Sequence, residues 1–476
     1  MNRTPENDAK DTEPGLQNQE PPSLEAQIDE ALLHHRAGQL AEAEDIYRRI
    51  LAVDPEYPYA LCLLGAIAQA AGEYDQAVDL ISRAIGAKPD YADAYSNLGA
   101  GLMVLLRHEE ALACFENATA LAPGNAEAHN NRGVSLRWLG RPEEAIASYR
   151  KAIDIRPDYA EAHHNLSFTL LACGQHQDGL DEYEWRWQSP TFNYTMRQYA
   201  RPMWDGTGDL ADKTLLLWPE QGPGDMVIWA SGIPEIIRRA GKCIIETSPK
   251  LVDLFARSFP EAEVRPENPA PDPKATDFDV HLPIGSLFRH LKQDLTAPCA
   301  AFLVPDPEKV ALYKQWLADL GPGPYVGISW KSPLVTPDRS LNYTRIDDWA
   351  LLLAQPAQFI NLECSDSDED IARARDQFGV TIHTFDGLDL FDDLDGVAAL
   401  AAALDVVISV STAVAPIAAG TGTPVCLAAW RQSPWSNFLL AARGPDVTWF
   451  EKNLDEPWDP VFTTIAERLM ELAKND

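Results

Sequence analysis

The sequence predicts a chain of mixed class, α + α/β, in which an N-terminal α-helical solenoid is followed by two Rossmann-like lobes. Three observations predict this organisation. Prolines and small residues recur every 34 positions over the first 190 residues. From residue 213 onward, apolar runs typical of buried strands alternate with helical segments. The length of 476 residues with 46% hydrophobic residues is enough for two or three separate cores. The polar, proline-bearing residues 1–21 are expected to be a disordered tail.

Several columns of residues carry the 34-residue period. They are Pro21, Pro55, Pro89, Pro123 and Pro157; Gly38, Gly72, Gly140 and Gly174, with Leu106 at the gap; Ala43, Ala77, Ala111 and Ala145, continued by Gly179; and Gly65, Gly99 and Gly133. In a unit of two antiparallel helices, small residues let the helices approach closely and proline stops the second helix. This pattern is the signature of the tetratricopeptide repeat (TPR). We expect five units within residues 22–190, the first and last degenerate, forming a scaffold that holds another polypeptide.

One further column is a candidate binding site for that polypeptide. Asn97, Asn131 and Asn165 share the 34-residue step and fall on the first helix of their repeats. That helix lines the concave face of such solenoids, where an amide can both donate to and accept from a peptide backbone. The ladder resembles that of the protein O-GlcNAc transferases, whose asparagines hold acceptor peptides. The alternative is that these are helix-surface asparagines inherited from the repeat consensus, and the first two repeats have Asp29 and Leu63 instead.

After a connector at residues 191–212, the strand candidates fall into two groups. The first group predicts an N-terminal lobe over residues 213–322, and the second a C-terminal lobe over residues 323–476. The candidate strands are 213–218, 242–247 and 278–283, then 325–330, 358–363, 380–385, 405–410 and 424–429, with helices expected at 225–240, 249–259, 394–404 and about 412–420. Two such lobes in succession, with a ligand cleft between them, are typical of GT-B glycosyltransferases, although dehydrogenases and epimerases also contain paired lobes.

A glycine-containing turn follows the first predicted strand of this half. Gly222 and Gly224 permit close backbone approach, and the helix that follows offers free N–H groups to a donor phosphate. Asp225 ends the turn, and an aspartate there is chemically suited to activate a nucleophile. Its alternative role is to cap the helix, and both roles are compatible. Glu220 and Gln221 are lesser candidates.

Two further loops are predicted to bind the donor. Lys331 follows the first strand of the second lobe, and with Arg339 nearby it could neutralise a departing phosphate; a solvated loop lysine is the alternative. Ser411 and Thr412 are expected at a helix N-terminus, where hydroxyls and free amides can seat phosphate. Gly420 and Gly422 are expected to end that helix.

Five stretches carry a resemblance to a known family. They are EYEWRW (182–187), PEQGPGDMVIWASGIP, DFDVHLPIGSLFRHL, VGISWKSPLVTPDRSL and LDVVISVSTAVAPIAAGTGTPV, spanning roughly residues 180–430. Together they resemble bacterial proteins that fuse TPR repeats to a GT-B domain related to the heptosyltransferases of glycosyltransferase family 9, some of which glycosylate flagellin in the cytoplasm. The resemblance implies inverting transfer from a UDP-, ADP- or CMP-linked sugar without a bound metal, with Asp225 deprotonating the acceptor hydroxyl.

The chain departs from that family at two positions. The family pattern reads Asp-Thr-x-x-x-His, whereas this sequence has Ser411 in place of the aspartate and Pro416 in place of the histidine. The loss of two polar ligands puts the donor and the activity itself in doubt. The alternative function is therefore a TPR adaptor with a catalytically inactive transferase-like domain. A lipopolysaccharide sugar transferase would explain the second half but not the repeats.

Composition excludes other classes. A net charge of −33 without a basic stretch argues against binding to nucleic acid or to an anionic membrane surface. Seven scattered cysteines argue against disulfides and structural zinc and fit a reducing cytoplasm. The sequence has no apolar signal-peptide core and no run long enough to span a membrane. The acidic runs at 366–370 and 385–395 are expected to be solvated rather than metal-binding, and His163 and His164 are expected at a repeat surface.

Overall fold

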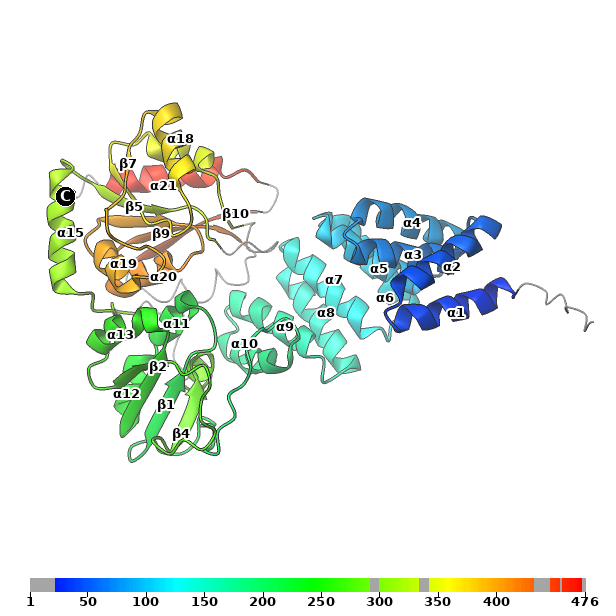
Figure 1. Cartoon of the computed structure of the whole chain (residues 1–476), viewed down its shortest axis with the longest axis horizontal. Helices are drawn as coiled ribbons and strands as arrows, with labels where there is room; N and C mark the ends of the chain where they lie inside the picture. Colours follow the sequence, from blue (N-terminus) through cyan, green and yellow to red (C-terminus); the bar gives the residue numbers. More distant parts are fainter. Residues whose placement is uncertain (1–21, 292–298, 334–341, 432–445, 454–455, 473–476) are drawn as a thin grey trace, which may run out of the picture. The chain divides into compact units, whose positions relative to one another are not determined.

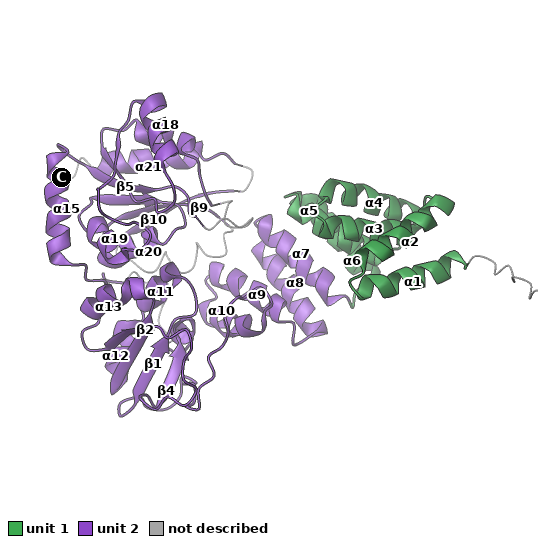
Figure 2. Ribbon diagram, viewed as in Figure 1, with its two compact units in different colours: residues 1–124 green, residues 125–476 purple. Residues whose placement is uncertain are grey.

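The computed structural model describes residues 22–291, 299–333, 342–431, 446–453 and 456–472. The chain forms two compact units, residues 1–124 and 125–476 (Figure 2). The boundary between the units falls inside the repeat array, after the third repeat, rather than at residue 190 where the predicted solenoid ends.

The first unit consists of three helical pairs with one apolar core. The helices are α1 (Leu24–Arg36), α2 (Leu40–Val53), α3 (Pro58–Ala70), α4 (Tyr74–Ala87), α5 (Ala92–Val104) and α6 (His108–Leu121). The second helix of each pair ends two residues before the proline of its repeat. The residue before proline leaves the helical conformation, as at Asp54 with φ −128° and ψ 97°, because the proline ring disfavours that conformation there.

The small residues act as predicted in this unit. A Cβ built on Gly65 would lie 2.5 Å from the Ile81 side chain, and one on Gly99 would lie 2.7 Å from Phe115. The turns between paired helices need a left-handed residue, with φ 82° at Gly72. At the gap in that column Leu106 adopts the same conformation with φ 59°.

The second unit begins with the fourth and fifth repeats. Their helices are α7 (Ala126–Trp138), α8 (Pro142–Ile155), α9 (Ala160–Ala172) and α10 (His176–Tyr183), followed by the 3-10 helix η1 (Glu184–Gln188). The Tyr149 ring packs directly against Gly133, since a Cβ there would lie 2.6 Å from that ring. The prediction of five helical repeats is therefore confirmed.

A four-stranded, all-parallel sheet follows, in the order β3-β2-β1-β4 (Figure 1). Its strands are β1 (Thr214–Trp218), β2 (Lys242–Thr247), β3 (Glu263–Pro266) and β4 (Val280–Pro283), and its helices are α11 (Pro223–Ala230), α12 (Ile233–Arg239), η2 (Pro249–Leu251), α13 (Val252–Ser258), η3 (Ile284–Ser286) and α14 (Leu287–Leu291). The sequence did not predict β3. The helix expected over 225–240 is broken at Gly232, where a Cβ would lie 3.0 Å from three apolar side chains of α14.

A second parallel sheet has the order β10-β9-β8-β5-β6-β7. Its strands are β5 (Tyr325–Ser329), β6 (Gln358–Asn361), β7 (Ile382–His383), β8 (Val406–Ser409), β9 (Val425–Trp430) and β10 (Val447–Lys452). Its helices are α15 (Pro307–Asp319), η4 (Ile346–Trp349), α17 (Ala350–Leu353), α18 (Asp368–Phe378), α19 (Leu394–Ala401), α20 (Val414–Thr421) and α21 (Asp459–Leu472). Strand β10 was not predicted. The helical N-terminal half and the parallel sheets of the C-terminal half confirm the α + α/β class.

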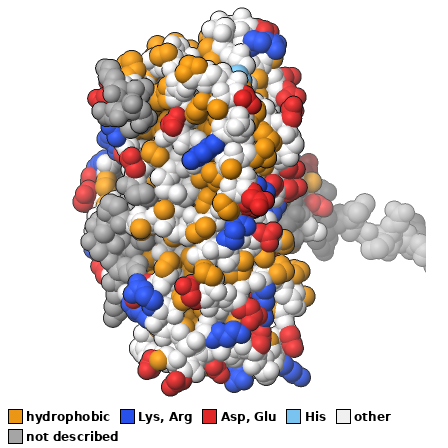
Figure 3. Space-filling model, turned by 90° about the vertical axis from the view of Figure 1, so that its left-hand side faces the viewer, with side chains coloured by type: hydrophobic (Ala, Val, Ile, Leu, Met, Phe, Trp, Pro, Cys, Tyr) orange, Lys and Arg blue, Asp and Glu red, His pale blue; other side chains and the backbone are white. Residues whose placement is uncertain are grey.

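Charge is distributed without a dominant basic region on the face drawn in Figure 3. Lysine and arginine side chains lie scattered among acidic and apolar ones over the described residues of that face. Within the described parts of the chain, every helix is too short or too polar to cross a bilayer.

Candidate functional site

In both sheets, the predicted motifs lie in loops that follow the strands where the strand order reverses. The chain leaves β1 toward β2 and β3 on one side and returns to β4 on the other; it leaves β5 toward β6 and β7 and returns to β8 on the other. In open parallel sheets, ligands bind outside the carboxyl ends of the strands where the order reverses in this way. The loops that follow β1, β5 and β8 contain the three motifs singled out from the sequence.

The turn after β1 has the geometry of a helix start, but Asp225 is not its cap. Gly222 is the N-cap residue of α11, Pro223 is the first helical residue and Asp225 is the third. Asp225 is therefore not the N-cap residue. Its half-buried carboxylate still lies in the first helical turn, where the helix dipole favours negative charge. A Cβ on Gly222 would lie 3.6 Å from Oδ2 of Asp225, so the carboxylate folds back over the turn.

Gly224 brings the two sheets' motifs together. A Cβ at this position would lie 3.2 Å from both Cα and Cβ of Ala413, the residue that precedes α20. Helices α11 and α20 are consequently in contact (Figure 1). Glycine is needed here because the loop after β1 approaches the loop after β8 closely. The sequence predicted close backbone approach at these glycines, without naming the partner.

The loop after β8 holds Ser411 and Thr412 just before α20, which begins at Val414. The Thr412 hydroxyl lies 3.1 Å from the Ser409 hydroxyl and 3.3 Å from the Ser329 hydroxyl at the end of β5. The loops after β5 and β8 thus meet, as the adjacency of these strands requires. Pro416 is buried in the first turn of α20, where a missing N–H group is tolerated.

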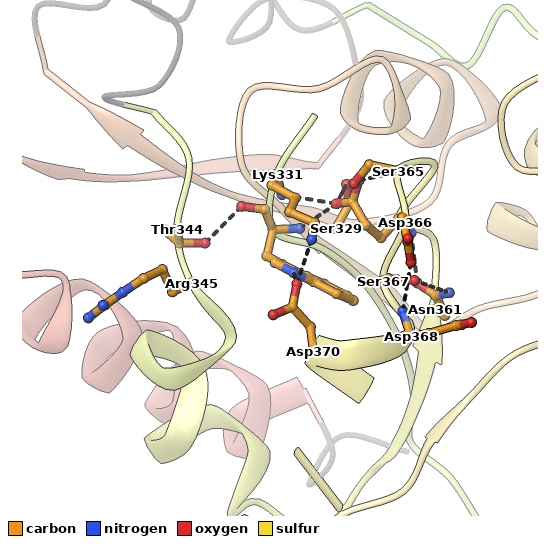
Figure 4. A network of polar contacts seen from close by, with 12 residues as sticks. Ser329, Lys331, Thr344, Arg345, Asn361, Ser365, Asp366, Ser367, Asp368 and Asp370 are labelled. Atoms are coloured by element: carbon orange, nitrogen blue, oxygen red, sulfur yellow. Dashed lines mark hydrogen bonds and ion pairs between the residues drawn. The ribbon is translucent and has the colours of Figure 1, made fainter. Parts of the chain in front are cut away.

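Lys331 is engaged by a carboxylate that the sequence analysis did not identify. Its Nζ lies 2.6 Å from Oδ2 of Asp370 in the first turn of α18, and the indole N–H of Trp330 donates to the same oxygen over 2.9 Å (Figure 4). A phosphate at Lys331 would have to compete with this ion pair. Arg339 lies outside the described residues.

Glu363 is the second residue that sequence reasoning missed. Its side chain is buried at the end of β6 and accepts hydrogen bonds from the backbone N–H groups of Trp330 (3.1 Å) and Lys331 (2.9 Å). The backbone N–H and the hydroxyl of Ser365 donate to its other oxygen. Burial raises the pKa of Glu363, and these donors oppose that rise. Glu363 could have been identified from the sequence because it is a carboxylate that directly follows an apolar strand run.

The lesser candidates from the loop after β1 have structural partners. Glu220 is 3% exposed and pairs with Arg186 over 2.8 Å. The Gln221 side-chain oxygen accepts a long hydrogen bond of 3.4 Å from the Tyr183 hydroxyl. Neither side chain is an exposed base.

The asparagine ladder lies on the first helices of its repeats, as predicted: Asn97 on α5, Asn131 on α7 and Asn165 on α9. All three are partly exposed, yet each takes part in hydrogen bonds within its unit. The Asn165 amide donates to Asn130 over 3.1 Å, and the Asn97 amide donates to the Cys62 sulfur over 3.5 Å. Both partners lie 35 residues earlier, so the amides link successive repeats and are only partly available to a peptide.

His163 of α9 is buried and His164 is half-buried, which corrects the expectation that both lie at a repeat surface. His163 is 6% exposed, pairs with Glu182 and stacks on Trp185 with ring centroids 4.0 Å apart. His164 lies against Phe168 and Tyr183, and burial, with the charges of Arg186 and Arg137, lowers its pKa to about 4. Sequence periodicity could not show the stacking on His163 because Trp185 follows the last repeat.

The acidic segment around residue 390 lies beside basic side chains. A hollow of about 340 Å³ is lined by Lys250, Lys309 and several aspartates, and Lys250 pairs with Asp392 over 2.7 Å. Over the described ranges, no cluster of histidine, cysteine and acidic side chains is arranged to hold a metal ion.

Known proteins resemble the two halves to different extents. The tetratricopeptide repeat family matches residues 21–102, 126–159 and 148–181, so the N-terminal region consists of TPR repeats. Protein FlbA of Caulobacter vibrioides is 33% identical over an alignment of 322 residues, with coverage of 62% of this chain and 52% of FlbA. The chain thus spans about half the length of that curated relative.

Among solved structures, the chain is similar to MamA from Desulfovibrio magneticus, with 22% identity, a TM-score of 0.31, and coverage of 34% of this chain and 91% of MamA. It is also similar to pilF of Pseudomonas aeruginosa, with 20% identity, a TM-score of 0.32, and coverage of 34% and 74%. At TM-scores this low, neither likeness carries an argument about function.

Proposed function

We propose that the protein is a cytoplasmic, metal-independent protein glycosyltransferase of the GT-B type. The observation that carries this proposal is the convergence of three loops at the points where the strand order reverses. Gly224 packs on Ala413, and Thr412 lies against Ser329, so the candidate base and the candidate phosphate-binding loops border one region. A base and a phosphate-binding region close together are what transfer from a nucleotide sugar requires.

In the proposed reaction, the TPR repeats hold a protein acceptor and Asp225 removes the proton from its attacking hydroxyl. The hydroxyl oxygen bonds to the anomeric carbon, the bond to the donor phosphate breaks, and the nucleotide leaves with the bonding electrons. The loops containing Lys331, Ser411 and Thr412 stabilise the charge on the leaving phosphate. Because the sequence resembles enzymes that modify flagellin, flagellin is the first acceptor to test.

The test begins with donor binding. The full chain is mixed with UDP, ADP and CMP and with sugars linked to each, and its melting temperature is measured; a nucleotide that binds only the folded state raises it. The acceptor is then incubated with the sugar that binds, and its mass is followed. A protein that binds none of these compounds and leaves flagellin unmodified would refute the proposal.

Asp225→Asn tests the assigned base. The Asn side chain has the same shape, and Asp225 is not the helix cap, so folding and nucleotide affinity should persist. Transfer should fall by about 10²–10⁴-fold, the usual contribution of a general base. Glu220→Gln is the comparison variant in the same loop; it should destabilise the fold because Glu220 pairs with a buried arginine. Undiminished transfer by Asp225→Asn would remove the assigned base.

The second candidate is an adaptor without catalytic activity. It is favoured by Ser411 and Pro416, which replace two polar family residues, and by the Lys331–Asp370 pair, which occupies the candidate phosphate ligand. An adaptor should bind its protein partner through the repeats whether or not nucleotide sugar is present. Binding with no change in acceptor mass would favour this function.

A further inference from the structure

Arg186 occupies an unusual position directly after the last repeat. It lies in η1 and is fully buried. Its Nη2 donates to Glu220 over 2.8 Å and to the Ser286 hydroxyl over 2.9 Å, while Nη1 donates to Glu184 over 2.9 Å. The guanidinium therefore connects η1 with the loops that follow β1 and β4, the two strands at which the order of the first sheet reverses.

The environment keeps this arginine charged. Burial acts to lower its pKa, but the carboxylates of Glu220 and Glu184 outweigh burial and raise it. The guanidinium carbon also lies 4.4 Å from the ring centre of Tyr183 and 4.6 Å from that of Trp187. The planar fork binds several acceptors at once, which a lysine ammonium in the same place could not reproduce.

On one side, Arg186 is tied to the repeat that carries the last rung of the ladder. The neighbouring Trp185 stacks on His163 of α9 with an interplanar angle of 4°. His163 also pairs with Glu182, and its Nε2–H donates a 2.9 Å hydrogen bond to the Pro157 carbonyl. Helix α9 also carries Asn165. The helix predicted to contact the acceptor therefore packs directly against η1, the segment that contains Arg186.

On the other side, Arg186 is tied to the segment that carries the candidate base. Glu220 precedes Asp225 by five residues, and Tyr183 donates to Gln221 between them. Gly285, in the loop after β4, leaves no room beside Glu220, since a Cβ there would lie 1.6 Å from its Oε1. The carboxylate is thus held from two directions, and a shift of Arg186 would move the start of the loop that ends at Asp225.

We propose that Arg186 is a positioning residue that, through Glu220, holds the segment 220–225 in a fixed orientation to the last repeat. It does not touch the reacting atoms. An acceptor lying along α9 then reaches Asp225 in one geometry, and displacements of about 1 Å in such geometry can reduce a rate about 10²-fold. This inference rests on the proposed function and adds a residue to it that lies outside the predicted site.

The test uses the full chain and two charge-neutral double variants. In R186M/E220M, apolar side chains of similar volume replace the pair, an exchange that folded proteins often tolerate. The control is R197M/E246M, which removes another buried pair attached to β2, with side chains 10% and 5% exposed. Arg186→Lys is the conservative variant, which keeps the charge but loses the fork.

Two measurements are made on each variant. The first is release of nucleotide from the UDP-, ADP- or CMP-linked sugar that the wild type binds, with the protein acceptor present, analysed as kcat and KM. The second is hydrogen exchange of the amides in residues 219–226. We expect kcat to fall about 10–100-fold at unchanged KM in R186M/E220M and to fall partly in Arg186→Lys. Exchange at 219–226 should accelerate in the double variant alone, and the control should retain both properties.

The outcomes separate this inference from the proposed function. If kcat and exchange at 219–226 are unchanged in folded R186M/E220M, Arg186 is not a positioning residue. An equal loss in the control would assign the effect to general destabilisation and likewise overturn the inference. If the wild type releases no nucleotide, the proposed function fails, and the exchange rates at 219–226 still decide whether Arg186 holds this segment.

Discussion

Lys331, the candidate phosphate ligand of the proposed function, pairs with Asp370. The side chains of this 2.6 Å ion pair are 31% and 25% exposed, so the pair stabilises the fold little, and under the proposed function a phosphate replaces Asp370. If Lys331 binds either Asp370 or a phosphate, substitution of each member of the pair should change nucleotide affinity. A lysine with a purely structural role would not show this.

We therefore predict that substitutions of Lys331 and of Asp370 change the affinity for nucleotide in opposite directions. Lys331→Ala should weaken binding of the nucleotide that the wild type binds by about tenfold, since a charge-assisted hydrogen bond is worth about 1.5–3 kcal/mol. Asp370→Asn should strengthen it, because the ammonium no longer has a competing carboxylate. Calorimetric titration of both variants checks the prediction; equal affinities in all three proteins would show that Lys331 does not contact the nucleotide.

His164 gives the protein a pH-dependent stability that can be measured. Its pKa is lowered to about 4 in the folded state, against an ordinary value of about 6.5 in the unfolded chain. As pH falls from 6.5 toward 4, the unfolded chain takes up a proton that the folded chain does not, so the free energy of unfolding decreases. The stability is present above pH 6.5, and the loss is on the order of 3 kcal/mol at most.

His164→Asn isolates this effect, because asparagine occupies the equivalent place at Asn130 in the preceding repeat. Denaturant unfolding from pH 7 to pH 5 should show a smaller decrease in the variant than in the wild type. The difference between the two proteins removes the contribution of His281, whose pKa is also lowered to about 4 by burial. Identical pH dependence would mean that His164 is protonated without cost.

At the scale of elements, the turn between α5 and α6 contains a strained residue, Leu106. The equivalent turns use glycine with φ near 75–82° at Gly38 and Gly72, whereas Leu106 is held at φ 59°. A left-handed conformation costs a residue with a Cβ roughly 1–2 kcal/mol. The Leu106 side chain is 50% exposed, so burial recovers little of that cost.

Leu106→Gly should consequently stabilise the first unit. The gain should be about 0.5–1 kcal/mol, since part of the relief is offset by the greater freedom of glycine in the unfolded chain. Gly72→Ala, the matched control at the equivalent turn, should lower stability because alanine acquires the same strain. Denaturant midpoints of both variants test this, and a destabilised Leu106→Gly would show that the leucine side chain makes a compensating contact.

At the scale of the whole molecule, the two compact units do not coincide with the two sequence-defined halves. Residues 125–190 have the repeat pattern, yet they pack with the sheets that follow. The Trp138 ring stacks on Trp430 at 4.4 Å, and Arg186 reaches Ser286 and Glu220. These contacts are as buried as those inside either sheet's core.

Truncation at the two boundaries should therefore give different results. Fragments 1–124 and 125–476 should each be soluble with cooperative unfolding, because each retains its own core. Fragment 191–476 should aggregate or unfold at lower temperature, because it leaves Glu220 without Arg186 and uncovers Trp430. Circular dichroism melts compare them; a fragment 191–476 as stable as 125–476 would show that the last two repeats do not support the sheets.

The sequence by itself determined the repeats, the strands of both sheets apart from β3 and β10, and the loops that contain Gly224, Lys331 and Thr412. It could do so because these features are local: a 34-residue period, apolar runs and glycine turns depend on neighbouring residues. Tertiary structure alone decided that Asp225 is not the N-cap residue, that Asp370 pairs with Lys331, and that His163 is buried. It also placed Arg186 against Glu220, 34 residues away, because the partner of a buried charge is chosen by packing and leaves no periodic trace in the sequence.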